Sequence, residues 1–81
     1  MNKSHSLDLS TLVSLVENLM KGSIIYQYVE EMPSAKEIAM EIIQREKITE
    51  PIIRHQINKH LEANGYEFNA RRVAWMKTAE L

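Results

Sequence analysis

The sequence has no cysteine. A disulfide scaffold, a thiolate zinc site and a thiol nucleophile are therefore excluded, and the absence fits a reducing compartment. Long apolar runs are also missing, since the longest covers only residues 73–76 and a membrane-spanning helix needs roughly 20 residues. Residues 1–5 lack the apolar stretch of a secretory signal. We therefore expect a cytoplasmic protein without a membrane partner.

Glycine and proline are scarce, with two of each. Both glycines, Gly22 and Gly65, stand where helices are expected to end, so the sequence contains no glycine-rich phosphate loop. The 81 residues suffice for one domain, and a content of 44% hydrophobic and 26% charged residues is typical of a folded chain. We expect a single domain over residues 1–81, in which the polar residues 1–6 are disordered.

Neither sign of charge dominates, because the formal net charge is −1 at pH 7. Residues 1–44 hold three basic and six acidic residues, whereas residues 45–81 hold seven basic and five acidic ones. This surplus of bases allows a cationic face on the C-terminal half. The pI near 6.3 nevertheless lies below the value of about 9 that is typical of strong nucleic-acid binders. A polyanion partner is compatible with this charge but is not required by it.

The first helix is expected over residues 8–21, where apolar residues recur at helical spacing. Ser6 or Asp8 is suited to cap its start, and Gly22 is suited to a left-handed position after its end. Four apolar residues follow the steps of a two-helix seam, namely Leu9, Val13, Val16 and Met20. This seam either packs inside the domain or contacts a second copy or another partner.

Residues 23–32 carry two patterns. Their β-branched and aromatic residues suit a strand, but apolar residues also recur at helical spacing. We favour a helix, because Glu30 and Glu31 continue the pattern up to Pro33. Adjacent residues on a helix do not face each other, so the two glutamates are not a catalytic acid pair.

A pair of helices is expected over residues 34–64. Ser34 and Glu37 form a capping box at its start, and the first helix should fade near residues 45–47. Thr49 is suited to cap the second helix. The buried stripe of that helix comprises Ile53, Ile57 and Leu61.

Two structures are compatible with residues 66–77, a two-stranded hairpin that turns near Asn69 or a short last helix that Asn69 caps. We favour the hairpin, because Tyr66 and Phe68 alternate around a glutamate as in a strand. Trp75 either closes the core or joins an exposed patch that contacts a partner.

On the second helix of the pair, the side away from the buried stripe is polar. His55, Asn58, Lys59 and Glu62 point outward, with Arg54 and Gln56 at the two borders. The carboxylate of Glu62 repels phosphate unless it reads a cytosine. Arginine, asparagine and glutamine hydrogen-bond base edges, and lysine contacts phosphate. These residues therefore suit major-groove reading, although an ordinary solvated helix face carries such residues too.

Three features of this region resemble the helix-turn-helix of winged-helix DNA-binding regulators. They are Glu-Ile-Ala at residues 37–39, a hydroxyl residue at Thr49 that opens the second helix, and Leu61 shortly before Gly65. The resemblance covers residues 33–77 and implies that helix 50–64 is the recognition helix. It implies nucleic-acid contacts, the last two at a wing, for Arg54, His55, Asn58, Lys59, Arg71 and Arg72. The stretch from residue 39 to residue 49 is about one helical turn longer than in the compact motif, so the first helix or the linker should be extended.

The histidines do not form a metal site. His55 and His60 are five residues apart and lie on different sides of a helix, whereas a zinc pair needs a spacing of four. His60 lies towards the apolar side, where a partly buried, hydrogen-bonded histidine is the ordinary case. We expect no metal, no cofactor and no catalysis.

Together these patterns predict a mainly α domain of three to four helices, in which a helix-turn-helix pair precedes a C-terminal two-stranded β-wing. The expected function is a DNA-binding transcriptional regulator that binds double-stranded DNA through helix 50–64 as a homodimer. The alternative is a small adaptor or inhibitor that binds a protein partner through its helical faces. The expected dimer or partner contacts are Leu9, Val13, Val16, Met20 and Trp75.

Overall fold

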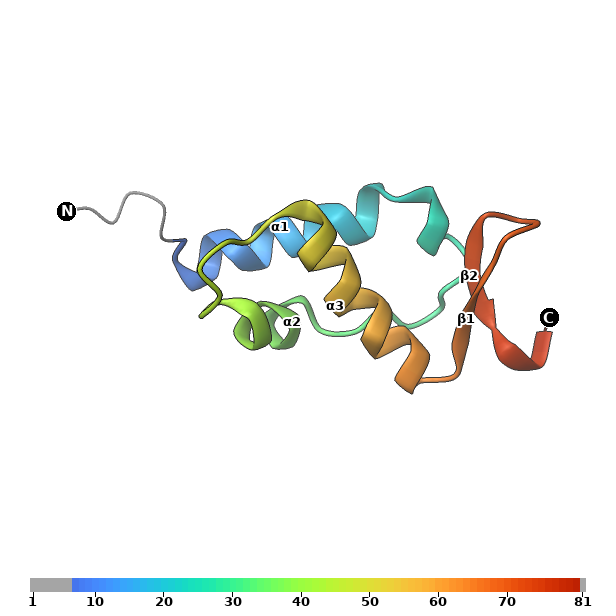
Figure 1. The fold of residues 1–81 in the computed structure, drawn as a ribbon. Coiled ribbons are helices and arrows are strands. Elements are labelled where there is room, and N and C mark those ends of the chain that lie inside the picture. The colour runs from blue at the N-terminus through green and yellow to red at the C-terminus, as the bar shows by residue number, and fades with distance from the viewer. Residues whose placement is uncertain (1–6, 81) are drawn as a thin grey trace.

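The computed structural model describes residues 7–80, so the disorder expected for residues 1–6 lies outside the described range. Three α-helices are followed by a two-stranded antiparallel sheet, which agrees with the predicted three to four helices and the favoured terminal hairpin (Figure 1). Within residues 7–80, no helix is long and apolar enough to cross a membrane.

Helix α1 spans Leu9–Gly22 and confirms the first predicted helix. Asp8 caps its start, because the Asp8 carboxylate accepts a hydrogen bond from the backbone N–H of Thr11 at 2.8 Å. The end of the helix differs from the prediction, since Gly22 is its last residue and has no positive φ. Ser23 leaves the helix in an extended conformation, so a left-handed residue is not needed there.

The segment after α1 forms neither the predicted helix nor a strand. Its regular structure is a single 3₁₀ turn, η1 (Ile24–Tyr26), and the chain then continues irregularly to α2. The buried residue is Tyr26, at 4% exposed, whereas Tyr28 in the predicted helical stripe is 42% exposed. Contacts between Tyr26 and the rest of the domain therefore override the local helical pattern.

Helix α2 spans Ala35–Ile42. The Ser34 hydroxyl accepts a hydrogen bond from the backbone N–H of Glu37 at 3.2 Å, which is one half of the predicted capping box. The helix ends earlier than the predicted residues 45–47. The extra length between the two paired helices therefore lies in their connection.

Helix α3 spans Glu50–Ala63, close to the predicted range. Thr49 occupies the N-cap position, but its side chain makes no capping hydrogen bond. The chain leaves the helix through Gly65, whose φ of 87° is easily adopted only by glycine. The predicted stripe is buried, as shown by exposures of 4%, 0% and 0% for Ile53, Ile57 and Leu61.

Strands β1 (Tyr66–Asn69) and β2 (Ala74–Lys77) form the favoured hairpin, and a short 3₁₀ turn, η2 (Thr78–Glu80), follows. Phe68 is opposite Trp75 in the antiparallel register, and their rings meet edge to face with centroids 6.0 Å apart. Trp75 is only 6% exposed, so it closes the core rather than forming an exposed patch.

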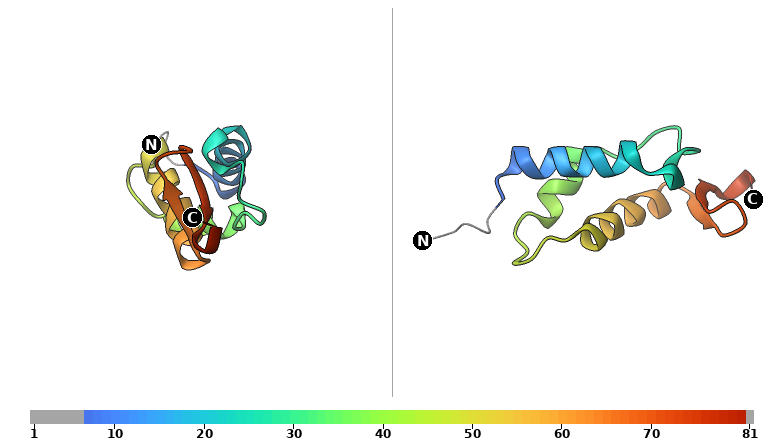
Figure 2. Two further views of the ribbon diagram at one scale, coloured as in Figure 1. Left: turned by 90° about the vertical axis from the view of Figure 1, so that its right-hand side faces the viewer. Right: turned by 90° about the horizontal axis from the view of Figure 1, so that it is seen from above.

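One core joins the helices to the hairpin. Figures 1 and 2 show that the hairpin lies at the end of the molecule reached by the C-terminal end of α3. The buried residues of the core are Leu12, Val16, Tyr26, Ile38, Ala39, Ile42, Ile53, Ile57, Leu61, Tyr66 and Trp75. Because α3 contributes three of these residues along its length, its orientation, and hence its outward side, is fixed by apolar packing.

Candidate nucleic-acid interface

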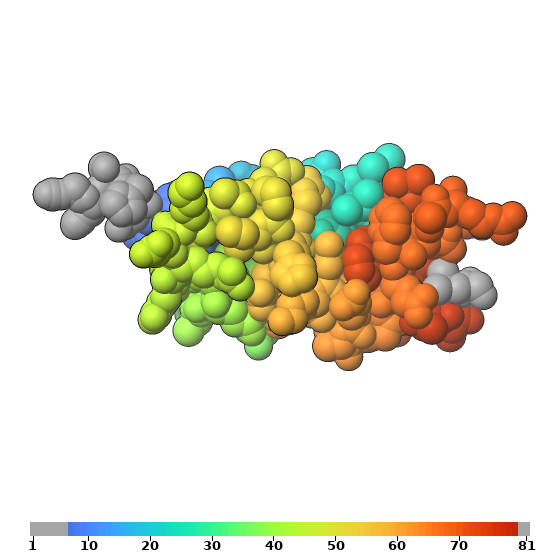
Figure 3. All heavy atoms as spheres, viewed as in Figure 1, coloured from blue at the N-terminus to red at the C-terminus, as the bar shows by residue number. Residues whose placement is uncertain are grey.

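Helix α3 has a narrow open face. Its apolar stripe points inward, so the residues on the opposite side of the helix point to solvent. His55 and Lys59 are both exposed there, as the sequence predicts. In the space-filling view, α3 runs in yellow to orange across the middle of the visible face (Figure 3). These two side chains are therefore free to contact a ligand.

Arg54 and Asn58 do not belong to this open face. The Nη1 atom of Arg54 donates a hydrogen bond to the Ser23 hydroxyl at 2.6 Å. The Tyr26 hydroxyl donates to the Oδ1 atom of Asn58 at 2.9 Å. We call these four residues the η1 junction. These bonds show that Arg54 and Asn58 hold α3 against the segment after α1, and their contact with DNA stays a prediction.

Charge within the η1 junction is balanced locally. Arg54 also forms an ion pair with Glu50 one turn earlier, with Nη2 and Oε2 2.8 Å apart. Burial raises the pKa of the Tyr26 hydroxyl, and the nearby Arg54 charge partly offsets this effect. The Tyr26 hydroxyl therefore stays protonated and able to donate at neutral pH.

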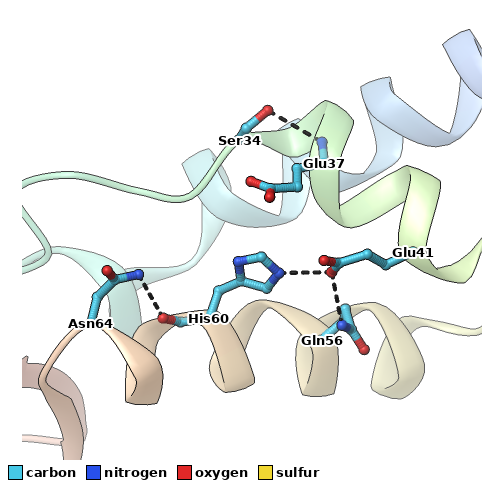
Figure 4. A network of polar contacts seen from close by, with 6 residues as sticks. All are labelled: Ser34, Glu37, Glu41, Gln56, His60 and Asn64. Atoms are coloured by element: carbon cyan, nitrogen blue, oxygen red, sulfur yellow. Dashed lines mark hydrogen bonds and ion pairs between the residues drawn. The ribbon is translucent and has the colours of Figure 1, made fainter.

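The opposite side of α3 is held by a carboxylate from α2. One oxygen of Glu41, Oε1, accepts hydrogen bonds from Gln56 Nε2 at 2.9 Å and from His60 Nε2 at 2.7 Å (Figure 4). We call these three residues the α2 junction. The His60 side chain is 19% exposed, so the prediction of a partly buried, hydrogen-bonded histidine is confirmed. Hydrogen bonds from His60 and Gln56 lower the pKa of the Glu41 carboxyl.

The α2 junction as a unit was not predicted from the sequence. One signal for it was present, because Gln56 and His60 are four residues apart and therefore lie on the same side of α3. The position of Glu41 opposite them depends on how α2 packs on α3, which no local pattern records.

The turn of the hairpin carries two free arginines. Arg71 and Arg72 are exposed, and their backbone N–H groups donate to the Asn69 side-chain oxygen at 2.9 and 3.1 Å. Val73 follows with a φ of 52°, a conformation that is costly for a β-branched residue. The turn is therefore held by its own hydrogen bonds and by the strands on either side, while its two cationic side chains face solvent.

Metal-binding groupings are not found in the described part of the chain. Within residues 7–80, no group of three or more histidine, aspartate or glutamate side chains is placed to hold a metal ion. His55 is exposed to solvent and His60 faces α2, so the two histidines lie on different sides of α3, as predicted.

The predicted partner contacts lie mostly inside the domain. Val16 is 0% exposed and Trp75 is 6% exposed. Leu9, Val13 and Met20 are half-buried and pack against the same core. A core this small needs these residues for its own stability. They therefore do not form a continuous free surface for a second copy.

Comparison with protein-family models, with curated proteins and with solved structures finds no match to this chain. Its function is therefore inferred from the geometry of its own residues.

Proposed function

We propose that this protein is a DNA-binding transcriptional regulator in which α3 is the recognition helix and the β1–β2 hairpin is a wing. The order of elements supports this proposal, because a pair of helices is followed directly by an antiparallel hairpin. Winged-helix regulators, which the sequence resembles, have this order. The longer connection between α2 and α3 does not displace α3 from the surface, since its outward side remains exposed.

The observation that carries the proposal is the placement of four free cationic or titratable side chains. His55 and Lys59 lie on the open face of α3, and Arg71 and Arg72 lie at the hairpin turn. Figure 3 shows α3 and the hairpin on one face of the molecule. A helix in the major groove with a cationic loop beside it over the phosphates is a geometry that duplex DNA accommodates.

This interface reads few bases. Arg54, the Oδ1 atom of Asn58 and the Nε2 atom of Gln56 are already hydrogen-bonded within the domain, so base contacts fall mainly to His55, and Lys59 contacts phosphate. Phosphate contacts from the hairpin then supply most of the affinity of one chain. Two chains on two half-sites would double both sets of contacts, so we propose that the protein acts as a homodimer on DNA.

The experiment is a salt titration of binding to random-sequence duplex DNA. Wild type is compared with a variant in which Lys59, Arg71 and Arg72 are changed to alanine. The logarithm of the association constant should fall linearly with the logarithm of salt concentration, and losing three phosphate contacts per chain should reduce the slope by about 3 for each bound chain. Arg54 is left unchanged, because it holds α3 in place.

A matched control removes three exposed lysines elsewhere, Lys21, Lys36 and Lys47. This control changes the net charge equally, so it should leave the slope close to that of wild type. Equal slopes for both triple variants would show that binding does not use the proposed face. No binding by wild type at about 50 mM salt would refute the DNA-binding function altogether.

A second candidate function rests on exposed apolar side chains. Ile24, Met40 and Val73 are 71%, 56% and 55% exposed, and each is a suitable contact for a protein partner. An adaptor or inhibitor that uses them would form a complex that survives high salt. An Ile24→Ser change would weaken that complex, and Lys59→Ala would leave it unchanged.

A further inference from the structure

The α2 junction lies where the proposed recognition helix rests on its supporting helix. Apolar contacts between α2 and α3 hold the helices together without fixing a direction, whereas hydrogen bonds are directional. Glu41 supplies that direction through the same oxygen atom to Gln56 and to His60, at 2.9 and 2.7 Å. Because the two donors are one turn apart on α3, the carboxylate restrains both the position and the tilt of that helix.

The imidazole of His60 lies among groups that respond to its charge. From α2, the Glu41 carboxylate is bonded to the ring, and Figure 4 shows Glu37 on the same helix with its backbone N–H bonded to Ser34. On α3 its neighbours are Gln56, Lys59 and Asn64, and the Asn64 amide donates to the His60 carbonyl oxygen at 2.8 Å. The charged group in direct contact with the ring is therefore the Glu41 carboxylate.

Protonation of this ring strengthens the bond that it makes. A neutral imidazole donates to Glu41 only in the tautomer that carries hydrogen on Nε2, whereas a charged imidazole always carries it. A charged donor also forms a shorter and stronger bond to a carboxylate. The Glu41 carboxyl stays ionised above its ordinary pKa of 4.5, because the hydrogen bonds from His60 and Gln56 lower that pKa.

We propose that Glu41 is a positioning residue for the DNA-binding surface, and that protonation of His60 tightens its hold on α3 and so raises the affinity for DNA at mildly acidic pH. This inference rests on the proposed function. DNA binds only those molecules in which α3 has the required orientation. A stronger bond between His60 and Glu41 increases the fraction of molecules in that orientation.

The experiment measures binding of the full chain to random-sequence duplex DNA at about pH 6 and about pH 8, at constant salt. The ratio of the two association constants is compared among wild type, His60→Gln, Glu41→Gln and the double variant. Glutamine at position 60 keeps a neutral hydrogen-bond donor that cannot become charged. All four proteins are also compared in a His55→Asn background, because His55 lies on the proposed DNA-binding face and its own charge changes the ratio.

We expect the ratio to be about threefold larger in wild type than in His60→Gln, which is the size of a partly exposed ion pair. Glu41→Gln should lower the ratio equally, and the double variant should lower it no further. A His60→Gln ratio equal to that of wild type overturns the proposal. A ratio that is lower in the double variant than in Glu41→Gln also overturns the proposal. The charge of His60 would then raise DNA affinity without its bond to Glu41.

Failure of the proposed function gives a different result, in which wild type binds no DNA at either pH. In that case, thermal unfolding measures whether the bond between His60 and Glu41 strengthens on acidification. A melting temperature that rises on acidification in wild type but not in His60→Gln supports the pH-dependent junction. Equal shifts in both proteins overturn it.

Discussion

The two sides of α3 are held by different chemistry. At the α2 junction, one partly exposed carboxylate accepts two hydrogen bonds, so this side depends on charge. At the η1 junction, a buried tyrosine and an arginine each bond a neutral acceptor. Both sides use polar residues that border the apolar stripe of the helix. On both sides of α3, polar residues next to the apolar stripe hold the helix in its orientation. Fewer polar residues are therefore available to a ligand than a helical projection suggests.

The largest effect is expected from Ile57→Ala, which truncates a fully buried residue in the apolar stripe of α3. Ile57 is 0% exposed, so the change leaves a cavity and should lower the free energy of unfolding by about 3 kcal/mol. Urea denaturation measures this loss. The exposed Lys59→Ala is the control and should change stability by less than about 0.5 kcal/mol. A small loss for Ile57→Ala would mean that the polar junctions, not the apolar stripe, hold α3.

The next largest loss of stability is expected from a substitution that breaks the η1 junction alone. Asn58→Leu removes the acceptor of the Tyr26 hydroxyl and leaves that buried donor without a partner, which should cost about 1.5 kcal/mol. Adding Tyr26→Phe removes the stranded donor as well. Urea denaturation should therefore show the double variant to be more stable than Asn58→Leu. If the second change adds its own penalty instead, the hydroxyl has another role in the fold.

Arg54→Ala separates a role in folding from a role in binding. It removes the bond to Ser23 and the ion pair with Glu50, so stability should fall by about 1 kcal/mol. The salt slope of DNA binding should stay unchanged, whereas Lys59→Ala should reduce it by about 1. Chemical denaturation and the salt titration together make this test. Equal reductions of the salt slope in Arg54→Ala and Lys59→Ala would show that Arg54 also contacts phosphate.

The parts of the fold that follow from local pattern were predictable. Helices α1 and α3 have regular apolar stripes, Asp8 and Ser34 are capping residues, and Gly65 allows the left-handed turn before the hairpin. Each of these signals involves residues within a few positions of one another. The exposure of His55 and Lys59 follows in the same way from the buried stripe of α3.

The remaining features depend on residues that are distant in the sequence. The bonds of the η1 junction join residues 31 and 32 positions apart, so the sequence could not show that Arg54 and Asn58 were already engaged. The same contacts place Tyr26 in the core and replace the helix expected over residues 23–32 by a short turn. Glu41 was missed for this reason too, since its two donors lie 15 and 19 positions away.

The smallest expected effect is the stability loss in Glu41→Gln. Its pH dependence tests whether the α2 junction, unlike the η1 junction, depends on an ionised carboxylate. The hydrogen bonds from His60 and Gln56 keep the folded-state pKa of Glu41 below its ordinary value of 4.5. The carboxylate therefore stabilises the fold above about pH 4.5, and this contribution is lost as the pH falls through the folded-state pKa. Glu41→Gln should be less stable than wild type by about 0.5 kcal/mol at neutral pH, since the group is largely exposed and screened by solvent. Urea midpoints should show this difference vanishing in acid, because a protonated Glu41 resembles glutamine. The Asn58→Leu penalty should persist over the same range, and a Glu41→Gln difference that persisted as well would remove the contrast between the two junctions.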